Sequence, residues 1–174
     1  MKKVLLIALV FTCLFLSCKK NNDSYYFRCS IDGTARTFNV GTLAHKEVYG
    51  GQYAYQTGGY ATSSTSGDWM GFYIDNTPSS DDINPGTYED SSPDFVVLGT
   101  FTDGTGGIDY DAGTSMYEDA ITYGHTITNH FKVTIQSIDS TSIKGTFSGD
   151  FYPEGNLDGI KKSITNGEFH LKWQ

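Results

Sequence analysis

Basic residues are scarce in this 174-residue chain, which has 12 Lys and Arg against 20 Asp and Glu and a formal net charge of −8. Binding to nucleic acid, or to an anionic membrane surface through a polybasic patch, depends on clustered Lys and Arg. The composition therefore argues against nucleic acid as a partner. It also disfavours anionic ligands, because the chain as a whole repels them.

The sequence also lacks the short motifs that carry common kinds of catalysis. It contains no G-x-S-x-G, and nothing in it positions a base beside Cys29. Paired carboxylates for glycoside hydrolysis cannot be picked out, since their separation in space decides that mechanism. The histidines are scattered and show no helical i, i+4 pair for a metal: His45, His125, His130 and His170. We therefore expect a protein that is not an enzyme and has no cofactor.

No apolar run in the sequence reaches the ~20 residues that a membrane-spanning helix needs. The longest extends from Val4 to Leu16, 13 residues, and follows Lys2 and Lys3. A short apolar run behind a positive start is typical of a signal peptide.

The apolar run ends in Ser17-Cys18, and the polar residues Lys19 to Asp23 follow at once. A small residue before a cysteine at such a switch resembles the lipobox of bacterial lipoproteins, and the lysine-containing polar tether is similar to lipoproteins of the Bacteroidota. The box departs from the stricter pattern at Phe15 and Leu16.

This resemblance implies that residues 1–17 are a signal peptide, that Cys18 carries lipid such as palmitate, and that residues 18–24 tether the domain. Each buried CH₂ of a lipid chain contributes ~0.8 kcal/mol, and two chains anchor a protein stably. The implied location is the outer membrane, where Cys18 joins the protein to the bilayer. Whether the domain faces the periplasm or the cell surface is left open.

Cysteine is correspondingly rare in the mature chain. With Cys13 in the signal peptide and Cys18 bearing lipid, Cys29 is the remaining thiol. No internal disulfide is then available, so the 157 mature residues, with a formal charge of −10, must be held by their core. Cys29 lies in an alternating strand, and we interpret it as a small buried hydrophobe.

A two-residue periodicity between Asn129 and Trp173 is the strongest pattern in the sequence. Three runs alternate apolar and polar residues, and they begin near Phe131, Ile143 and Phe169. Successive strand residues point to opposite faces, so these runs predict an antiparallel meander with one face on a core. The apolar parity shifts around Asn166-Gly167, where we predict a glycine bulge.

An earlier hairpin is predicted from Tyr25–Ile31 and Thr34–Val40, because the Asp32-Gly33 pair between them supplies the positive φ angles of a two-residue turn. This register places Phe27 opposite Phe38. The hairpin would open the folded domain.

A second pair is predicted from Tyr53–Ser63 and Asp68–Asp75. Both faces of the latter are apolar, so it is either a central strand or one with a binding surface outside. Shorter strands are expected after Pro85-Gly86 and over Phe95–Phe101. Two segments stay ambiguous: Gly41–Gly51 could form one helical turn, and Met116–Thr122 could form a strand or a helical turn.

An aromatic content of 14% together with 20 Gly is typical of an all-β domain with many turns. We predict a single antiparallel β-sandwich of about eight or nine strands over residues 25–174, with a lipocalin-like β-barrel as the alternative. The motifs Lys144-Gly145-Thr146-Phe147-Ser148-Gly149 and Ile164-Thr165-Asn166-Gly167-Glu168-Phe169, with Ile31-Asp32-Gly33, are similar to small Bacteroidota lipoproteins that carry domains of unknown function. That resemblance implies a β-rich envelope domain and no catalytic residues.

Aromatic residues supply the candidate binding site. Flat aromatic faces on a sheet stack on sugar rings, although the same residues can simply fill the sheet's outer face. The candidate ligand-binding residues are Tyr53, Tyr55, Trp69 and Tyr73, with Tyr60 in the same cluster.

The acidic stretch Asp103 to Asp111 has alternating oxygen ligands that Ca²⁺ favours. It lacks the closing Glu of an EF-hand, so whether this stretch binds calcium is left open.

Three hypotheses for function follow. The first is a non-enzymatic, lipid-anchored module that binds a glycan or another envelope protein. The second is a structural or assembly component of the envelope without a small ligand. The third is a barrel that holds an apolar small molecule.

Overall fold

The computed structural model describes residues 25–49, 52–63, 67–76 and 82–174. The expected signal peptide, the lipid-bearing Cys18 and the tether lie outside these residues. Within them no helix combines the length and apolarity of a membrane span.

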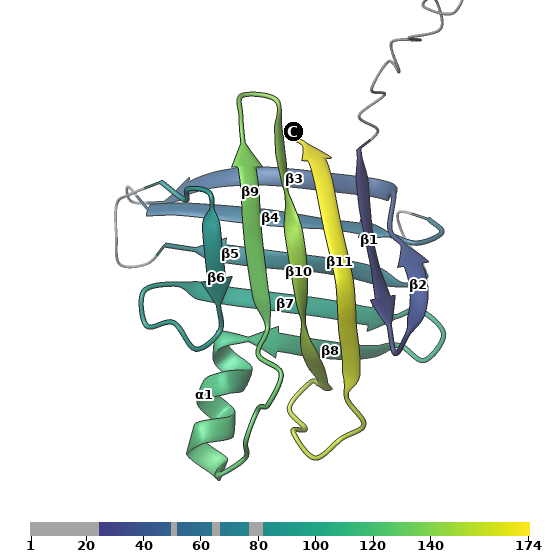
Figure 1. The fold of residues 1–174 in the computed structure, drawn as a ribbon. Helices are drawn as coiled ribbons and strands as arrows, with labels where there is room; N and C mark the ends of the chain where they lie inside the picture. The colour runs from purple at the N-terminus through teal and green to yellow at the C-terminus, as the bar shows by residue number, and fades with distance from the viewer. Residues whose placement is uncertain (1–24, 50–51, 64–66, 77–81) are drawn as a thin grey trace, which may run out of the picture.

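The described chain forms eleven strands and one helix (Figure 1). In chain order the elements are β1 (Tyr26–Ile31), β2 (Thr34–Thr37), β3 (Val40–Tyr49), β4 (Gln52–Tyr60), β5 (Trp69–Asp75), β6 (Gly86–Glu89), β7 (Val96–Asp103), β8 (Ile108–Gly113), α1 (Thr114–Tyr123), β9 (Lys132–Ile138), β10 (Ser142–Pro153) and β11 (Lys162–Lys172). The all-β prediction is confirmed.

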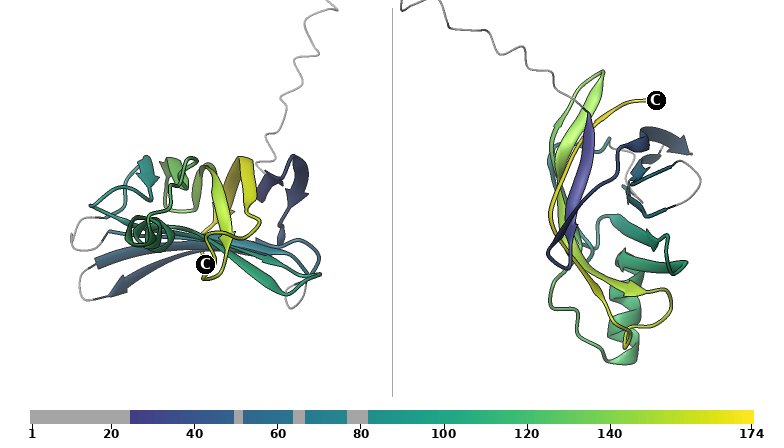
Figure 2. Two further views of the ribbon diagram at one scale, coloured as in Figure 1. Left: turned by 90° about the horizontal axis from the view of Figure 1, so that it is seen from below. Right: turned by 90° about the vertical axis from the view of Figure 1, so that its right-hand side faces the viewer.

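All strand pairs are antiparallel and join in the order β2-β1-β11-β10-β8-β7-β5-β4-β3, with β9 on β10 and β6 on β9. The sheet curls into a half-barrel whose two layers cross at a steep angle, as Figures 1 and 2 show. One layer holds β6, β9, β10, β11, β1 and β2, and the other holds β3, β4, β5, β7 and β8. The architecture therefore lies between the predicted sandwich and the barrel alternative.

Strand β10 connects the two layers. Its first part pairs with β9 and β11, and its last residues, Tyr152 and Pro153, pair with β8. The register on β11 shifts between Phe147 and Gly149, and Gly149 has φ 152°. A Cβ at Gly149 would lie 2.5 Å from Phe131 Cα, so glycine permits both the bend and the close approach of the backbones.

The predicted first hairpin and meander are confirmed. Asp32 (φ 50°) and Gly33 (φ 80°) form the turn between β1 and β2, and Phe38 donates its N–H to the carbonyl of Phe27 at 2.8 Å. Strands β9, β10 and β11 are neighbours in the predicted order. The register of β11 shifts on both of its neighbours around Asn166, which has φ 51°, so the predicted bulge is present.

The two ambiguous segments have definite structures. The segment from Gly41 is not a helical turn, because it lies in β3 and pairs with β4 along most of its length. The segment from Met116 belongs to the ten-residue helix α1, which ends at Gly124 with φ 76°. Met116 and Ala120 of α1 pack against Ile127 and Tyr152 in a small separate cluster.

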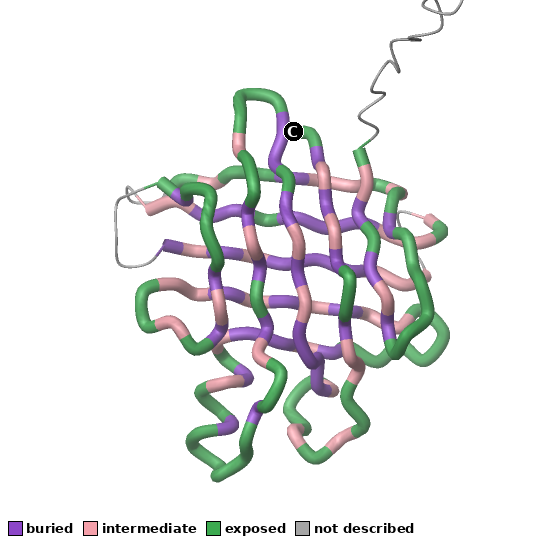
Figure 3. Tube along the Cα trace, in the orientation of Figure 1, coloured by how far each residue is buried: buried purple, intermediate pink, exposed green. Residues whose placement is uncertain are grey.

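The main core fills the space between the layers, and Figure 3 shows how buried and exposed residues alternate along the strands. Phe27 stacks on Phe147 with ring centroids 5.0 Å apart, and Phe72 from the other layer lies 5.0 Å from Phe169. Cys29 belongs to this core and is 3% exposed, as its interpretation as a small buried hydrophobe requires.

Candidate functional site

Strand β5 divides its side chains between the core and the outer surface of its layer. Met70, Phe72 and Ile74 are buried in the core, whereas Trp69 and Tyr73 on the opposite face are half-buried. The strand lies between β4 and β7. It is therefore a central strand, which was one of the two alternatives predicted from its two apolar faces.

The indole of Trp69 lies over two glycines that face each other on adjacent strands. Gly58 of β4 pairs with Gly71 of β5. A Cβ at Gly58 would lie 2.8 Å from Trp69 Cζ2, and a Cβ at Gly71 would lie 2.6 Å from the same atom. Because both glycines lack a side chain, the ring rests on the backbone of the two strands, and Trp69 as a whole is half-buried. Tyr60 lies beside it, with ring centroids 6.5 Å apart.

Hydroxyl and carboxylate groups flank this indole on the neighbouring strands. Trp69 and Gly71 pair with Thr102 and Thr100 of β7. Thr102 donates to Asp109 at 2.6 Å, and Thr100 donates to Asp111 at 3.2 Å. Burial raises the pKa of Asp111 above its ordinary value, and the hydrogen bond from Thr100 opposes that shift. We call Trp69, Tyr60 and these two Thr–Asp pairs the Trp69 platform.

The four candidate aromatic residues do not share one surface. Tyr55 is 1% exposed, donates its hydroxyl to Asp82 at 2.9 Å, and has its pKa raised mainly by burial. Its ring lies 5.2 Å from that of Trp173, and both line a cavity of about 340 Å³. Tyr53 is half-buried with Lys46 Nζ 4.5 Å from its ring centroid. Trp69 and Tyr73, in contrast, lie on the outer face, where Tyr73 donates to Asp75 at 3.2 Å.

The oxygen-rich stretch after β7 is internally hydrogen-bonded. Asp103 accepts hydrogen bonds from the backbone and the hydroxyl of Thr105, which lower the pKa of its carboxyl group. Across the described ranges, no group of three or more His, Cys, Asp or Glu side chains is placed to hold a metal ion. The four histidines lie apart from one another. Three of them each contact one carboxylate, His130 that of Asp90, His125 that of Asp158 and His45 that of Glu47. The ring of His170 lies beside those of Tyr25 and Tyr26.

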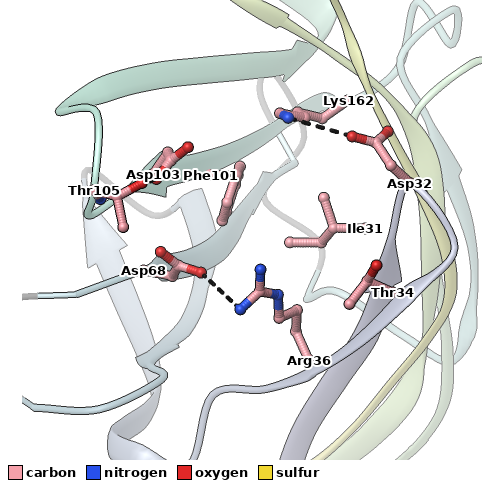
Figure 4. A pocket seen from close by; sticks show the side chains of 9 residues that line it. All are labelled: Ile31, Asp32, Thr34, Arg36, Asp68, Phe101, Asp103, Thr105 and Lys162. Carbon is pink, nitrogen blue, oxygen red and sulfur yellow. Dashed lines mark hydrogen bonds and ion pairs between the residues drawn. The ribbon is translucent and has the colours of Figure 1, made fainter.

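A polar cavity of about 240 Å³ opens at the edge where the two layers separate (Figure 4). No motif in the sequence predicted this cavity. Its walls come from the β1–β2 hairpin, the start of β5, the end of β7 and the start of β11, which are distant in sequence. The lining residues are Ile31, Asp32, Thr34, Arg36, Asp68, Phe101, Asp103, Thr105 and Lys162. The sequence predicted the Asp32-Gly33 turn and an oxygen-rich stretch that begins at Asp103, but it did not show that these two segments lie close together.

Comparisons of the chain with protein-family models, with curated proteins and with solved structures found no match.

Proposed function

We propose that this protein is a non-enzymatic, lipid-anchored module of the outer membrane that binds a glycan. The observation that carries the proposal is the half-buried indole of Trp69, laid over Gly58 and Gly71 on the outer face of its layer. Sugar rings have an apolar face of C–H groups and a polar rim of hydroxyls. An aromatic surface flanked by polar groups complements both parts.

The Thr–Asp pairs supply the polar half of this recognition. Carboxylates accept hydrogen bonds from sugar hydroxyls, and Asp109 and Asp111 both lie on β8, two strands from the strand that carries Trp69. Asp109 is exposed and Asp111 is half-buried, so each has accessible surface. The arrangement favours neutral sugars with hydroxyl donors over acidic sugars, whose carboxylates these side chains would repel.

The anchor is the second part of the proposal. Lipid on Cys18 would hold the folded domain at the bilayer through a short polar tether. Metabolic labelling with palmitate tests this directly, and label is expected on the wild type and lost in Cys18→Ala. Label that persists in the variant would contradict the anchor and leave the glycan site untouched.

A glycan array with the full-length protein in detergent tests the binding function. We expect binding to neutral glycans, reduced at least tenfold by Trp69→Ala and less by Trp69→Phe, which keeps a flat ring. Tyr123→Ala is the matched control, because it removes a 72% exposed aromatic ring at the end of α1. Circular dichroism establishes that each variant folds. Absence of binding in the wild type, or equal binding by wild type and Trp69→Ala, would refute the proposal.

The assembly hypothesis has one observation in its favour. Strand β2 is an edge of the sheet, and its residues Thr34–Thr37 are all exposed. An edge strand has backbone groups available for pairing with an extended segment of another envelope protein. Crosslinking from Ala35 in intact cells would test this alternative, since a discrete crosslinked partner is expected only if that edge is used.

A further inference from the structure

The polar cavity at the open edge has charges of opposite sign on its two sides. Arg36 and Lys162 come from β2 and β11, which belong to one layer. Asp68 precedes β5 and Asp103 ends β7, both in the other layer. Figure 4 shows the guanidinium of Arg36 pointing into the space toward Asp68. The cavity therefore has a cationic wall facing an anionic wall, with Asp32 beside Lys162.

The ion pairs in this cavity are long. Arg36 Nη1 lies 3.7 Å from Asp68 Oδ2, and Lys162 Nζ lies 3.3 Å from Asp32 Oδ2. Charge-assisted N–H···O hydrogen bonds are shorter, at about 2.7–2.9 Å. Within the part of the chain that the structure describes, neither Arg36 nor Lys162 donates a hydrogen bond at these distances. Both cations thus retain donors for a ligand.

The carboxylates of the opposite wall accept hydrogen bonds from the β7–β8 turn. Asp68 Oδ1 accepts from the backbone of Gly104 at 3.1 Å, and Asp103 Oδ1 accepts from Thr105. Asp68 Oδ2, the second oxygen of that carboxylate, has the long ion pair with Arg36 described above. The hydrogen bonds fix both carboxylates in place, so the wall is organised before a ligand arrives.

The base of the cavity is apolar and its volume is small. Ile31 and Phe101 line it and are otherwise buried in the core. A volume of about 240 Å³ falls below the ~300–1,000 Å³ of sites for drug-sized molecules. A short carbon frame fits both the volume and the apolar base.

We propose that this cavity binds a small zwitterion of the amino-acid type, with its carboxylate on Arg36 and Lys162 and its ammonium on Asp68 and Asp103. An anion would meet three carboxylates in a chain of net charge −8, and a simple cation would meet two basic side chains. A zwitterion aligned across the cavity satisfies both walls. This inference goes beyond the proposed glycan function and depends on different residues.

Isothermal titration calorimetry of the full-length protein in detergent with L-leucine tests the proposal. Two analogues each remove one charge: N-acetyl-L-leucine lacks the ammonium, and L-leucinamide lacks the carboxylate. We expect L-leucine to bind and each analogue to bind at least tenfold more weakly. No heat of binding with L-leucine up to about 10 mM, a concentration that would reveal a Kd in the millimolar range, would overturn the proposal. Binding of either analogue as tight as that of L-leucine would overturn it as well.

Variants locate the site. Arg36→Gln and Asp103→Asn are each expected to weaken L-leucine binding at least tenfold. Both substitutions remove the charge and keep a polar side chain, and Asp103→Asn also keeps its size. Arg28→Gln is the matched control, because Arg28 lies on the same hairpin but pairs with Glu168 outside the cavity. If Arg28→Gln weakens binding as much as Arg36→Gln does, or if neither cavity variant weakens it, the assignment to this cavity is wrong.

Discussion

The indole of Trp69 lies over the backbone of Gly71, two residues further along the same strand. Side chains two apart on a strand share one face, so a side chain at position 71 would occupy the space that the ring fills. The same ring covers Gly58 on the adjacent strand. The missing side chains of these two paired glycines thus allow the indole to lie against the sheet, and the Trp69 platform depends on them.

Gly71→Ala is expected to destabilise the protein by about 1–3 kcal/mol and to displace the indole. The added Cβ would lie 2.6 Å both from Trp69 Cζ2 and from the backbone oxygen of Thr57. The ring can swing away but the carbonyl of a paired strand cannot. Urea denaturation measures the loss, and the change in tryptophan fluorescence at low urea reports the displaced ring.

Gly86→Ala is the matched control for this substitution. Gly86 also lies in a strand, β6, and its nearest heavy atom to a new Cβ is 3.9 Å away. We expect a change within about 0.5 kcal/mol. Equal losses in the two variants would mean that contact with the indole and with Thr57 is not the cause.

Thr57→Val is expected to stabilise the protein. Thr57 is fully buried opposite Phe72, and its hydroxyl has no hydrogen-bond partner within the described residues. A buried hydroxyl without a hydrogen-bond partner has a desolvation cost that no hydrogen bond offsets. Valine has nearly the same shape as threonine and avoids this cost. The free energy of unfolding should rise by about 1 kcal/mol in urea denaturation.

Thr87→Val on β6 provides the comparison. Thr87 is exposed, and its hydroxyl lies 3.0 Å from that of Thr134 on the paired strand. Here the same substitution removes a hydrogen bond, and no stabilisation is expected. If Thr57→Val instead lowers stability by as much as Thr87→Val, the hydroxyl of Thr57 has a favourable role.

Local sequence pattern predicted the elements whose two faces differ. The runs around Val133, Phe147 and Leu171 alternate cleanly, and Asp32-Gly33 is a turn by its own backbone preference. Segment Val40–Tyr49 lacks such alternation and is a strand because β4 pairs with it. That cause is tertiary, so propensity could not reveal it.

The aromatic candidates show a different limit. The segment around Tyr53 and Tyr55 has apolar residues on both faces, and sequence cannot then say which face is inside. In the structure, Tyr55 contacts Trp173 on the inner side of the layer. Trp69 lies on the opposite, outer side. The polar cavity could not be predicted from the sequence at all, because Arg36, Asp103 and Lys162 come together only when the sheet curls.

Cys29 is expected to resist alkylation in the folded protein. Burial raises the pKa of its thiol from 9.0 to about 12, and the side chain is also shielded from reagents. The reactive thiolate is therefore scarce at pH 8. Iodoacetamide labelling, read on the Cys29 peptide by mass spectrometry, should follow the urea unfolding curve. Labelling in native buffer at the rate of the denatured protein would contradict a buried position.

Asp139 is expected to make stability depend on pH in the acid range. The hydroxyl of Thr141 and the backbone N–H groups of Thr141 and Ser142 donate to its carboxylate, at 2.6, 2.7 and 2.9 Å. These hydrogen bonds lower its pKa from 3.8 to about 2 in the turn between β9 and β10. Because the folded pKa is below the unfolded one, the stabilisation is complete above about pH 4 and is lost as the pH falls toward 2.

Asp139→Asn should therefore lower stability at pH 6 and flatten its decline between pH 4 and pH 2, as measured by thermal unfolding across that range. Asp94→Asn is the control, since it removes one carboxylate from another exposed loop position and leaves the β9–β10 turn intact. Only the Asp139 variant should change the slope. Its carboxylate accepts hydrogen bonds from the backbone and hydroxyl groups of both Thr141 and Ser142, and these stabilise the charged form. An unchanged slope in Asp139→Asn would assign the acid sensitivity to other carboxylates and would leave the turn held by its backbone alone.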